Sequence, residues 1–131
     1  MMARVLVVDD HEDSRELMAA MLATAGHQSV LAADGDEAMA LLKREQVDLA
    51  LVDIFLPIKD GIEVIREIRR DYPAIKIVAV SAGWGPPTLP GREQYCDLHV
   101  LKTARDVGAE GALPKPLSKD ALLTLVEGLI D

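Results

Sequence analysis

The chain has 131 residues and a formal net charge of −8, with 14 Lys and Arg against 22 Asp and Glu. The length predicts one domain over residues 1–131. The negative charge disfavours direct DNA binding and binding to anionic membranes, because both partners would repel it. Cys96 is the only cysteine, which excludes an intrachain disulfide and a thiolate metal cluster. No apolar run approaches the roughly 20 residues that span a bilayer, and the first residues show no secretory pattern, so we expect a cytoplasmic protein without membrane insertion.

The predicted strands and helices alternate along the chain. Short β-branched runs predict strands at residues 5–8, 29–31, 49–52 and 75–80, and a weaker run predicts a fifth at 111–113. Apolar residues recur at helical spacing between them, at positions 17–25, 38–42, 62–68 and 122–129. Near-continuous apolar strands suit a parallel sheet that is buried on both faces. The pattern therefore predicts an α/β doubly wound sheet with helices on both sides.

Turn and capping residues mark the ends of several predicted helices. Gly26 and Pro73 follow the first and third helical stretches, and Ser118 precedes the last one as an expected N-cap. The run at residues 34–36, Asp-Gly-Asp, lacks the spacing of an EF-hand loop. A helix cap is therefore favoured there over a calcium site.

One segment interrupts the alternation. Residues 83–95 contain three prolines and three glycines, which excludes a regular helix or an interior strand. We expect a long loop between the fourth strand and the fourth helix. Loops longer than about 12 residues are uncommon in compact domains and are often functional.

Chemically active side chains follow four of the five predicted strands. Asp9 and Asp10 follow the first strand, Asp53 the third, Ser81 the fourth and Lys115 the fifth. Ligands of open parallel sheets bind beyond the carboxyl ends of the strands, where the strand order reverses. In the order 2-1-3-4-5 that reversal lies between strands one and three, so the three carboxylates would converge there. Each residue alone is better explained as a cap or turn residue, but five on one edge indicate a joint site.

This predicted site has the parts for phosphoryl transfer. Three carboxylates in one crevice repel one another unless a cation holds them, and Mg²⁺ suits a few carboxylates with several retained waters. Lys115 and the Ser81 hydroxyl can hold an anionic group, and a carboxylate can accept a phosphoryl group to give an aspartyl phosphate. His11, beside the acidic pair, is a further candidate metal ligand, although a solvated loop residue is the favoured interpretation.

Several motifs occur together in a specific order and spacing. They are Val7-Val8-Asp9-Asp10-His11, Ala33-Asp34-Gly35, the run from Asp48 to Pro57, Asp60-Gly61-Ile62-Glu63-Val64, Val80-Ser81-Ala82, Gly108-Ala109 and Lys115-Pro116. In this arrangement the chain resembles the receiver domains of two-component response regulators, of the chemotaxis-regulator type, over nearly its whole length. The resemblance implies a flavodoxin-like (βα)5 sandwich with a five-stranded parallel sheet in the order 2-1-3-4-5.

The resemblance assigns a role to each carboxylate. Asp53 would accept a phosphoryl group from the phosphohistidine of a sensor histidine kinase or a phosphotransfer protein. Asp10, Asp53 and the backbone carbonyl of Phe55 would bind Mg²⁺, and Asp9 would contribute through water. Such a domain catalyses only its own phosphorylation and dephosphorylation and is not a turnover enzyme.

The resemblance also assigns the phosphoryl contacts and the output. Lys115 would pair with the phosphoryl group, and Ser81 would hydrogen-bond it together with the backbone amide of Ala82. The Lys115-Pro116 bond would be a cis peptide that aims the lysine. Phosphorylation would switch the surface of helix four and strand five to signal to a downstream protein effector. A face built from helices four and five is also a candidate homodimer interface.

Three features depart from the family pattern. Ala112 stands where the family usually has an aromatic residue that moves with the Ser or Thr, so that coupled movement is impossible here. The segment between Ser81 and Lys115 is about a dozen residues longer than is usual in the family. Trp84 or Tyr95 in this segment is a candidate substitute for the aromatic, with anchoring of the loop by Trp84 as the favoured alternative. Phe55 occupies a position that is often polar, and its side chain is expected to slow dephosphorylation by shielding the acyl phosphate from water.

Two other functional classes fit parts of the sequence. A phosphatase of the haloacid dehalogenase type also uses a strand-end Asp with Mg²⁺, Ser and Lys, but it needs a second acid two residues after the nucleophile, where this chain has Phe55. A phosphorylation-independent interaction module would keep the fold without the chemistry. The retained Asp53, Ser81 and Lys115 argue against that module, while Ala112 argues weakly for it.

Overall fold

A computed structural model describes residues 2–81, 102–115 and 117–130. Its five strands form one parallel sheet in the order β2-β1-β3-β4-β5. The expected flavodoxin-like α/β fold with strand order 2-1-3-4-5 is therefore confirmed. The strands are β1 (Arg4–Val8), β2 (Gln28–Ala32), β3 (Leu49–Asp53), β4 (Lys76–Ser81) and β5 (Gly111–Pro114), and the helices are α1 (Glu12–Ala23), α2 (Gly35–Arg44), α3 (Gly61–Asp71) and α5 (Lys119–Ile130). Residues 102–106 are also helical.

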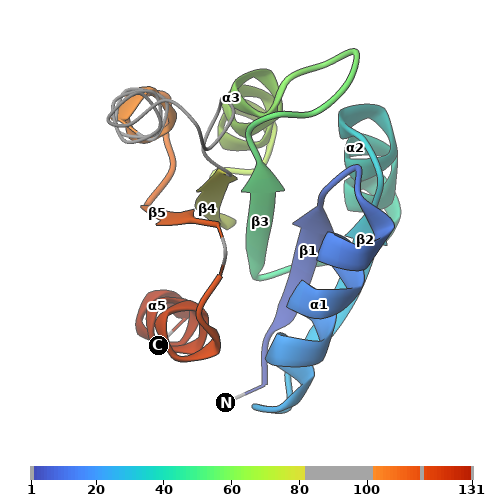
Figure 1. Cartoon of the computed structure of the whole chain (residues 1–131). Coiled ribbons are helices and arrows are strands. Elements are labelled where there is room, and N and C mark those ends of the chain that lie inside the picture. Colours follow the sequence, from blue (N-terminus) through green and yellow to red (C-terminus); the bar gives the residue numbers. More distant parts are fainter. Residues whose placement is uncertain (1, 82–101, 116, 131) are drawn as a thin grey trace, which may run out of the picture.

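Helices cover both faces of the sheet (Figure 1). Because successive side chains of a strand point to opposite faces, the sheet has a separate core on each of its faces. Leu6, Ala50 and Ile77 pack with α2 and α3 on one face, and Val5, Leu51 and Val78 pack with α1 and α5 on the other. Burial on both faces is the reason why these strands read as continuous apolar runs.

The apolar face of α1 differs from the sequence-based expectation. Met18 and Leu22 are the buried residues of this helix, whereas Leu17, expected in the stripe, is 54% exposed. The expected stripe also included Ala25, which lies beyond the end of the helix at Ala23. Since neighbouring residues are about 100° apart around a helix, contact along the Met18–Leu22 line leaves Leu17 outside the core.

Local capping follows the sequence signals. The side chain of Asp34 accepts a hydrogen bond from the backbone N–H of Glu37 and so caps α2, as expected. The Ser118 hydroxyl oxygen accepts one from the Ala121 N–H, 3.3 Å away, at the start of α5. Gly26 follows α1 with a φ of +86°, a backbone conformation that glycine adopts without strain. In the part of the chain that the structure describes, no helix is long and apolar enough to cross a membrane.

The start of β5 is tied to α3 and β4. Arg69 of α3 donates hydrogen bonds from Nε and Nη2 to the carbonyl oxygen of Gly108, at 3.2 and 2.8 Å. It also pairs with Glu110, whose other carboxylate oxygen accepts the backbone N–H of Ile77 at 2.6 Å. These contacts fix one end of a short strand whose other end leads directly into Lys115.

Gly61 brings the start of α3 against the end of β3. Its backbone N–H donates to the carbonyl oxygen of Ile54 at 2.8 Å. A Cβ on Gly61 would lie less than 3.0 Å from backbone atoms of Asp53 and Ile54, which cannot move away as a flexible side chain could. The close approach places Gly61 directly behind the residue that ends β3.

We expect Gly61→Ala to lower the free energy of unfolding by about 3 kcal/mol or more, because backbone atoms must shift to make room. Gly128→Ala is the matched control. Gly128 lies inside α5 with nothing within 4 Å of the added Cβ, so this variant should gain about 0.5–1 kcal/mol. Urea denaturation of both variants checks the pair, and equal effects would contradict the close packing behind Asp53.

Candidate functional site

Polar side chains from four strands are gathered at one edge of the sheet. The strands are parallel, so their carboxyl ends meet at the same edge, as the arrowheads of β1 and β3 show (Figure 1). Asp9 follows β1, Asp53 ends β3 and Ser81 ends β4, and each of the three is buried. Lys115 follows β5 and is partly buried. Ordinary turn residues are exposed to solvent. The burial of these polar side chains therefore distinguishes them from residues that only form turns.

The ammonium group of Lys115 joins the two buried carboxylates. Its Nζ lies 2.7 Å from Oδ2 of Asp9 and 3.2 Å from Oδ2 of Asp53. The backbone also holds the lysine in place, since its N–H donates to the carbonyl oxygen of Ser81 at 2.8 Å. Asp53 is oriented by the N–H of Phe55, which donates to its Oδ1 at 2.9 Å. The predicted convergence of Asp9, Asp53 and Lys115 is thus present in atomic contacts.

The two carboxylates respond differently to the same lysine. Burial acts to raise the pKa of Asp9, but hydrogen bonds from Lys115, the His11 backbone and Ser14 outweigh it, so the pKa lies below its ordinary value. Burial raises the pKa of Asp53, and the attraction of Lys115 and the Phe55 N–H offset this only in part. Burial acts to lower the pKa of Lys115, but its contacts with Asp9 and Asp53 raise it above the usual range. The lysine therefore stays charged between them.

A group of side-chain atoms that could bind a metal ion lies beside the Lys115 contact. One ligand atom each from Asp9, Asp10 and His11 lie within 4.8 Å of one another. The side chain of Asp9 is fully buried and that of Asp10 is 30% exposed. Paired carboxylate oxygens open to solvent on one side fit Mg²⁺, which takes oxygen ligands and retains several waters. In the described residues Asp53 does not belong to this close group, and its predicted place among the metal ligands stays a prediction.

Comparison with known proteins decides the family. A family model described as the response regulator receiver domain matches residues 5–90. The chain belongs to the receiver domain family of response regulators. A response regulator receiver protein of Anaeromyxobacter sp. (strain Fw109-5) is 31% identical over 95% of this chain, and response regulator MprA of Mycolicibacterium vanbaalenii is 31% identical over 99%. This chain spans about half the length of these two curated relatives, 47% and 51%.

Solved receiver domains share the fold over their whole length. The receiver domain of NtrX from Brucella abortus is 29% identical, with a TM-score of 0.83, and the match covers 96% of this chain and 97% of that one. Chemotaxis protein CheY4 of Vibrio cholerae is 28% identical, with a TM-score of 0.79, and the match covers 98% and 99% of the two chains. The receiver fold therefore accounts for nearly all of this chain.

Several sequence-based assignments of this receiver domain lie outside the described residues. These are the Ala82 backbone amide, the Pro116 side of the expected cis peptide, and the 83–95 loop with Trp84 and Tyr95. They stay predictions.

Sequence reasoning missed two supporting residues on α1. Arg15 donates from Nη1 to the carbonyl oxygen of Asp9 at 2.8 Å, and Ser14 contributes to the lowered pKa of the Asp9 carboxyl. Both lie in the first turns of α1, which begins three residues after Asp9. Their approach to Asp9 depends on how the chain turns between β1 and α1, which the sequence pattern did not indicate.

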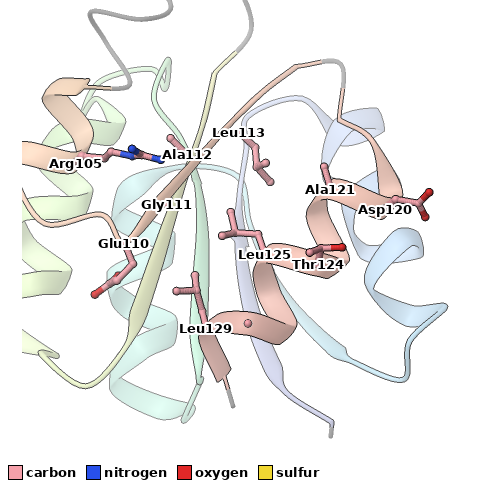
Figure 2. A pocket seen from close by; sticks show the side chains of 11 residues that line it. Arg105, Glu110, Gly111, Ala112, Leu113, Asp120, Ala121, Thr124, Leu125 and Leu129 are labelled. Atoms are coloured by element: carbon pink, nitrogen blue, oxygen red, sulfur yellow. The ribbon is translucent and has the colours of Figure 1, made fainter.

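The receiver domain also has a cavity away from the acidic edge, between β5 and α5. Figure 2 shows Ala112 and Leu113 of β5 and Leu125 and Leu129 of α5 along this cavity of about 680 Å³. Ala112 is small and only partly buried. The position in β5 where an aromatic residue was expected is therefore occupied by the small side chain of Ala112.

We expect Asp9→Asn to lower and Asp53→Asn to raise the free energy of unfolding at pH 7. The lowered pKa of Asp9 means that folding stabilises its charged form, and a hydrogen bond to a charged group is worth about 1.5–3 kcal/mol. The raised pKa of Asp53 means that folding disfavours its charge, and a neutral isostere removes that cost. Urea denaturation of both variants beside the wild type measures the two changes.

The same pair has a defined pH dependence. The stability from ionised Asp9 is fully present above its ordinary pKa of 3.8 and is lost as the pH falls below that value. The cost of ionised Asp53 is absent at low pH, sets in as the pH rises above its ordinary pKa of 3.8 and is complete above its raised pKa. The two variants should therefore approach the wild type in acid, and changes of the same sign at pH 7 would contradict the assignment.

Proposed function

We propose that this receiver domain accepts a phosphoryl group on Asp53 in an Mg²⁺-dependent reaction. The donor is the phosphohistidine of a sensor histidine kinase or a phosphotransfer protein. The observation that supports this most directly is the pairing of buried Asp9 and Asp53 through the Nζ of Lys115. Parallel strands bring these groups together from three separate parts of the chain, in a family whose members are response regulators.

The chemistry follows from the contacts around Asp53. A carboxylate oxygen of Asp53 attacks phosphorus while the phosphorus–nitrogen bond to the donor histidine breaks, and the released imidazole takes up a proton. The N–H bond from Phe55 to Oδ1 fixes the orientation of the carboxylate during this step. Lys115 is placed to move from Asp53 to the incoming phosphoryl oxygens, whose negative charge it offsets. The Ser81 hydroxyl, buried at the end of β4, hydrogen-bonds the same group together with the Ala82 amide.

The acidic residues would hold the metal ion. Asp10, Asp53 and the backbone carbonyl of Phe55 would bind Mg²⁺ directly, and Asp9 would act through water. When bound, Mg²⁺ supplies neutralisation of charge on the transferred phosphoryl group. The pair of carboxylates at residues 9 and 10 provides the hard oxygen donors that this ion prefers.

The output would be a change of surface rather than turnover of a substrate. Phosphorylation adds a dianion beside Ser81 and Lys115, and the surface of helix four and strand five then repacks to bind a downstream protein effector. A homodimer through the fourth and fifth helices is a second use of that surface. The domain catalyses only its own phosphorylation and dephosphorylation, and it acts in the cytoplasm without direct DNA binding.

Incubation with acetyl phosphate and Mg²⁺ should add one phosphoryl mass to the wild-type chain, measured by intact-mass spectrometry. The Asp53→Asn variant should show no added mass, and neither should the wild type when the metal is chelated. A folded wild type that gains no mass and binds neither Mg²⁺ nor beryllofluoride would contradict the proposal and favour a phosphorylation-independent interaction module.

Phe55 gives a prediction about the lifetime of the phosphorylated state. Phe55 is 37% exposed and lies two residues after Asp53, where its side chain can shield the acyl phosphate from water. Phe55→Asn should therefore shorten the phosphate half-life, followed by intact mass after removal of acetyl phosphate. The exposed Ile58, which lies in the same connection but is 97% solvent-accessible, offers the matched control Ile58→Asn. An unchanged half-life in Phe55→Asn would remove Phe55 from this role.

A further inference from the structure

His11 is held beside the acidic pair by its own backbone. Its backbone N–H donates to Oδ1 of Asp9 at 2.9 Å, which holds His11 next to the Asp9 carboxylate. Its imidazole Nδ1 lies 3.2 Å from Oδ1 of Asp10 and 3.7 Å from Oδ1 of Asp9. The imidazole is 75% exposed, so solvent and ions reach it freely.

The separation of His11 and Asp10 matches that between neighbouring ligands of one metal ion. Ligands about 2.1 Å from a six-coordinate ion lie about 3.0 Å apart in adjacent positions, and those of a tetrahedral ion lie about 3.4 Å apart. The Nδ1 distance to Asp10, 3.2 Å, lies between these two values, whereas the distance to Asp9, 3.7 Å, is longer than both. Lys115 contacts the other oxygen of Asp9, Oδ2, so it does not occupy the side that faces His11.

We propose that the acidic pocket binds first-row transition-metal dications, such as Ni²⁺, with the Nδ1 of His11 as a ligand beside the carboxylate of Asp10. This proposal rests on the proposed metal site and adds a nitrogen donor to it. Imidazole suits Ni²⁺, Cu²⁺ and Zn²⁺, whereas Mg²⁺ prefers oxygen. His11 therefore sets which ion fills the pocket, and it favours transition metals over Mg²⁺ at equal concentration.

Isothermal titration of the full chain with NiCl₂ and, separately, with MgCl₂ tests the proposal. His11→Ala should weaken Ni²⁺ binding by about tenfold or more, the usual minimum for groups that support a metal site. The same variant should change Mg²⁺ binding by less than about threefold, because Mg²⁺ gains little from a nitrogen donor. Excess Mg²⁺ should displace Ni²⁺ from the wild type, which shows that both ions share one pocket.

Two further variants separate the outcomes. His99→Ala controls for adventitious binding to another histidine and should leave Ni²⁺ affinity unchanged, and Asp10→Asn should weaken both ions. Equal Ni²⁺ affinity in His11→Ala and wild type would overturn the proposal and leave the contact between His11 and Asp10 as a simple ion pair. In that case retained Mg²⁺ binding would keep the proposed function intact, whereas a wild type that binds neither ion would remove the metal site on which both proposals depend.

Discussion

The contact of one ammonium group with two buried carboxylates is the interaction around which this domain is arranged. Lys115 lies 2.7 Å from Asp9 and 3.2 Å from Asp53, at the end of three strands that are distant in sequence. A buried carboxylate without such a partner would carry a large desolvation cost, so the site depends on the lysine arriving in the right place. The lysine arrives there because β5 is anchored at its start by Arg69 and Glu110 and continues directly into Lys115.

The rest of the fold supplies the precision that this contact needs. Two cores hold the sheet from both sides, and Gly61 lets α3 approach the backbone of Asp53 more closely than any residue with a side chain would allow. The carboxylates of Asp9 and Asp53 lie buried at the acidic edge of this sheet. Their positions come from the strands that they follow and from backbone N–H donors at Phe55 and His11.

Much of this arrangement could be predicted from the sequence, because strand ends are strongly marked. Continuous apolar runs defined the parallel sheet, and the polar residue after each run identified Asp9, Asp53, Ser81 and Lys115 without knowledge of their contacts. Helix faces were less predictable, since Leu17 and Met18 are both apolar and only the packing of α1 selects Met18 for the core. The approach of Arg15 and His11 to Asp9 depends on how the chain turns between β1 and α1, a geometry that periodicity does not encode.

The unequal hold of Lys115 on its two partners has a consequence for regioselectivity. Two carboxylates stand side by side at the proposed reaction site, and either one is an oxygen nucleophile in principle. Both oxygens of Asp9 accept strong hydrogen bonds, from the His11 N–H and from Lys115, and its pKa is lowered accordingly. The Asp9 carboxylate is therefore weakly basic. Both oxygens of Asp53 also accept hydrogen bonds, from the Phe55 N–H and from Lys115, but its contact to the lysine is longer and its pKa is raised, which makes it the more basic of the two competing nucleophiles.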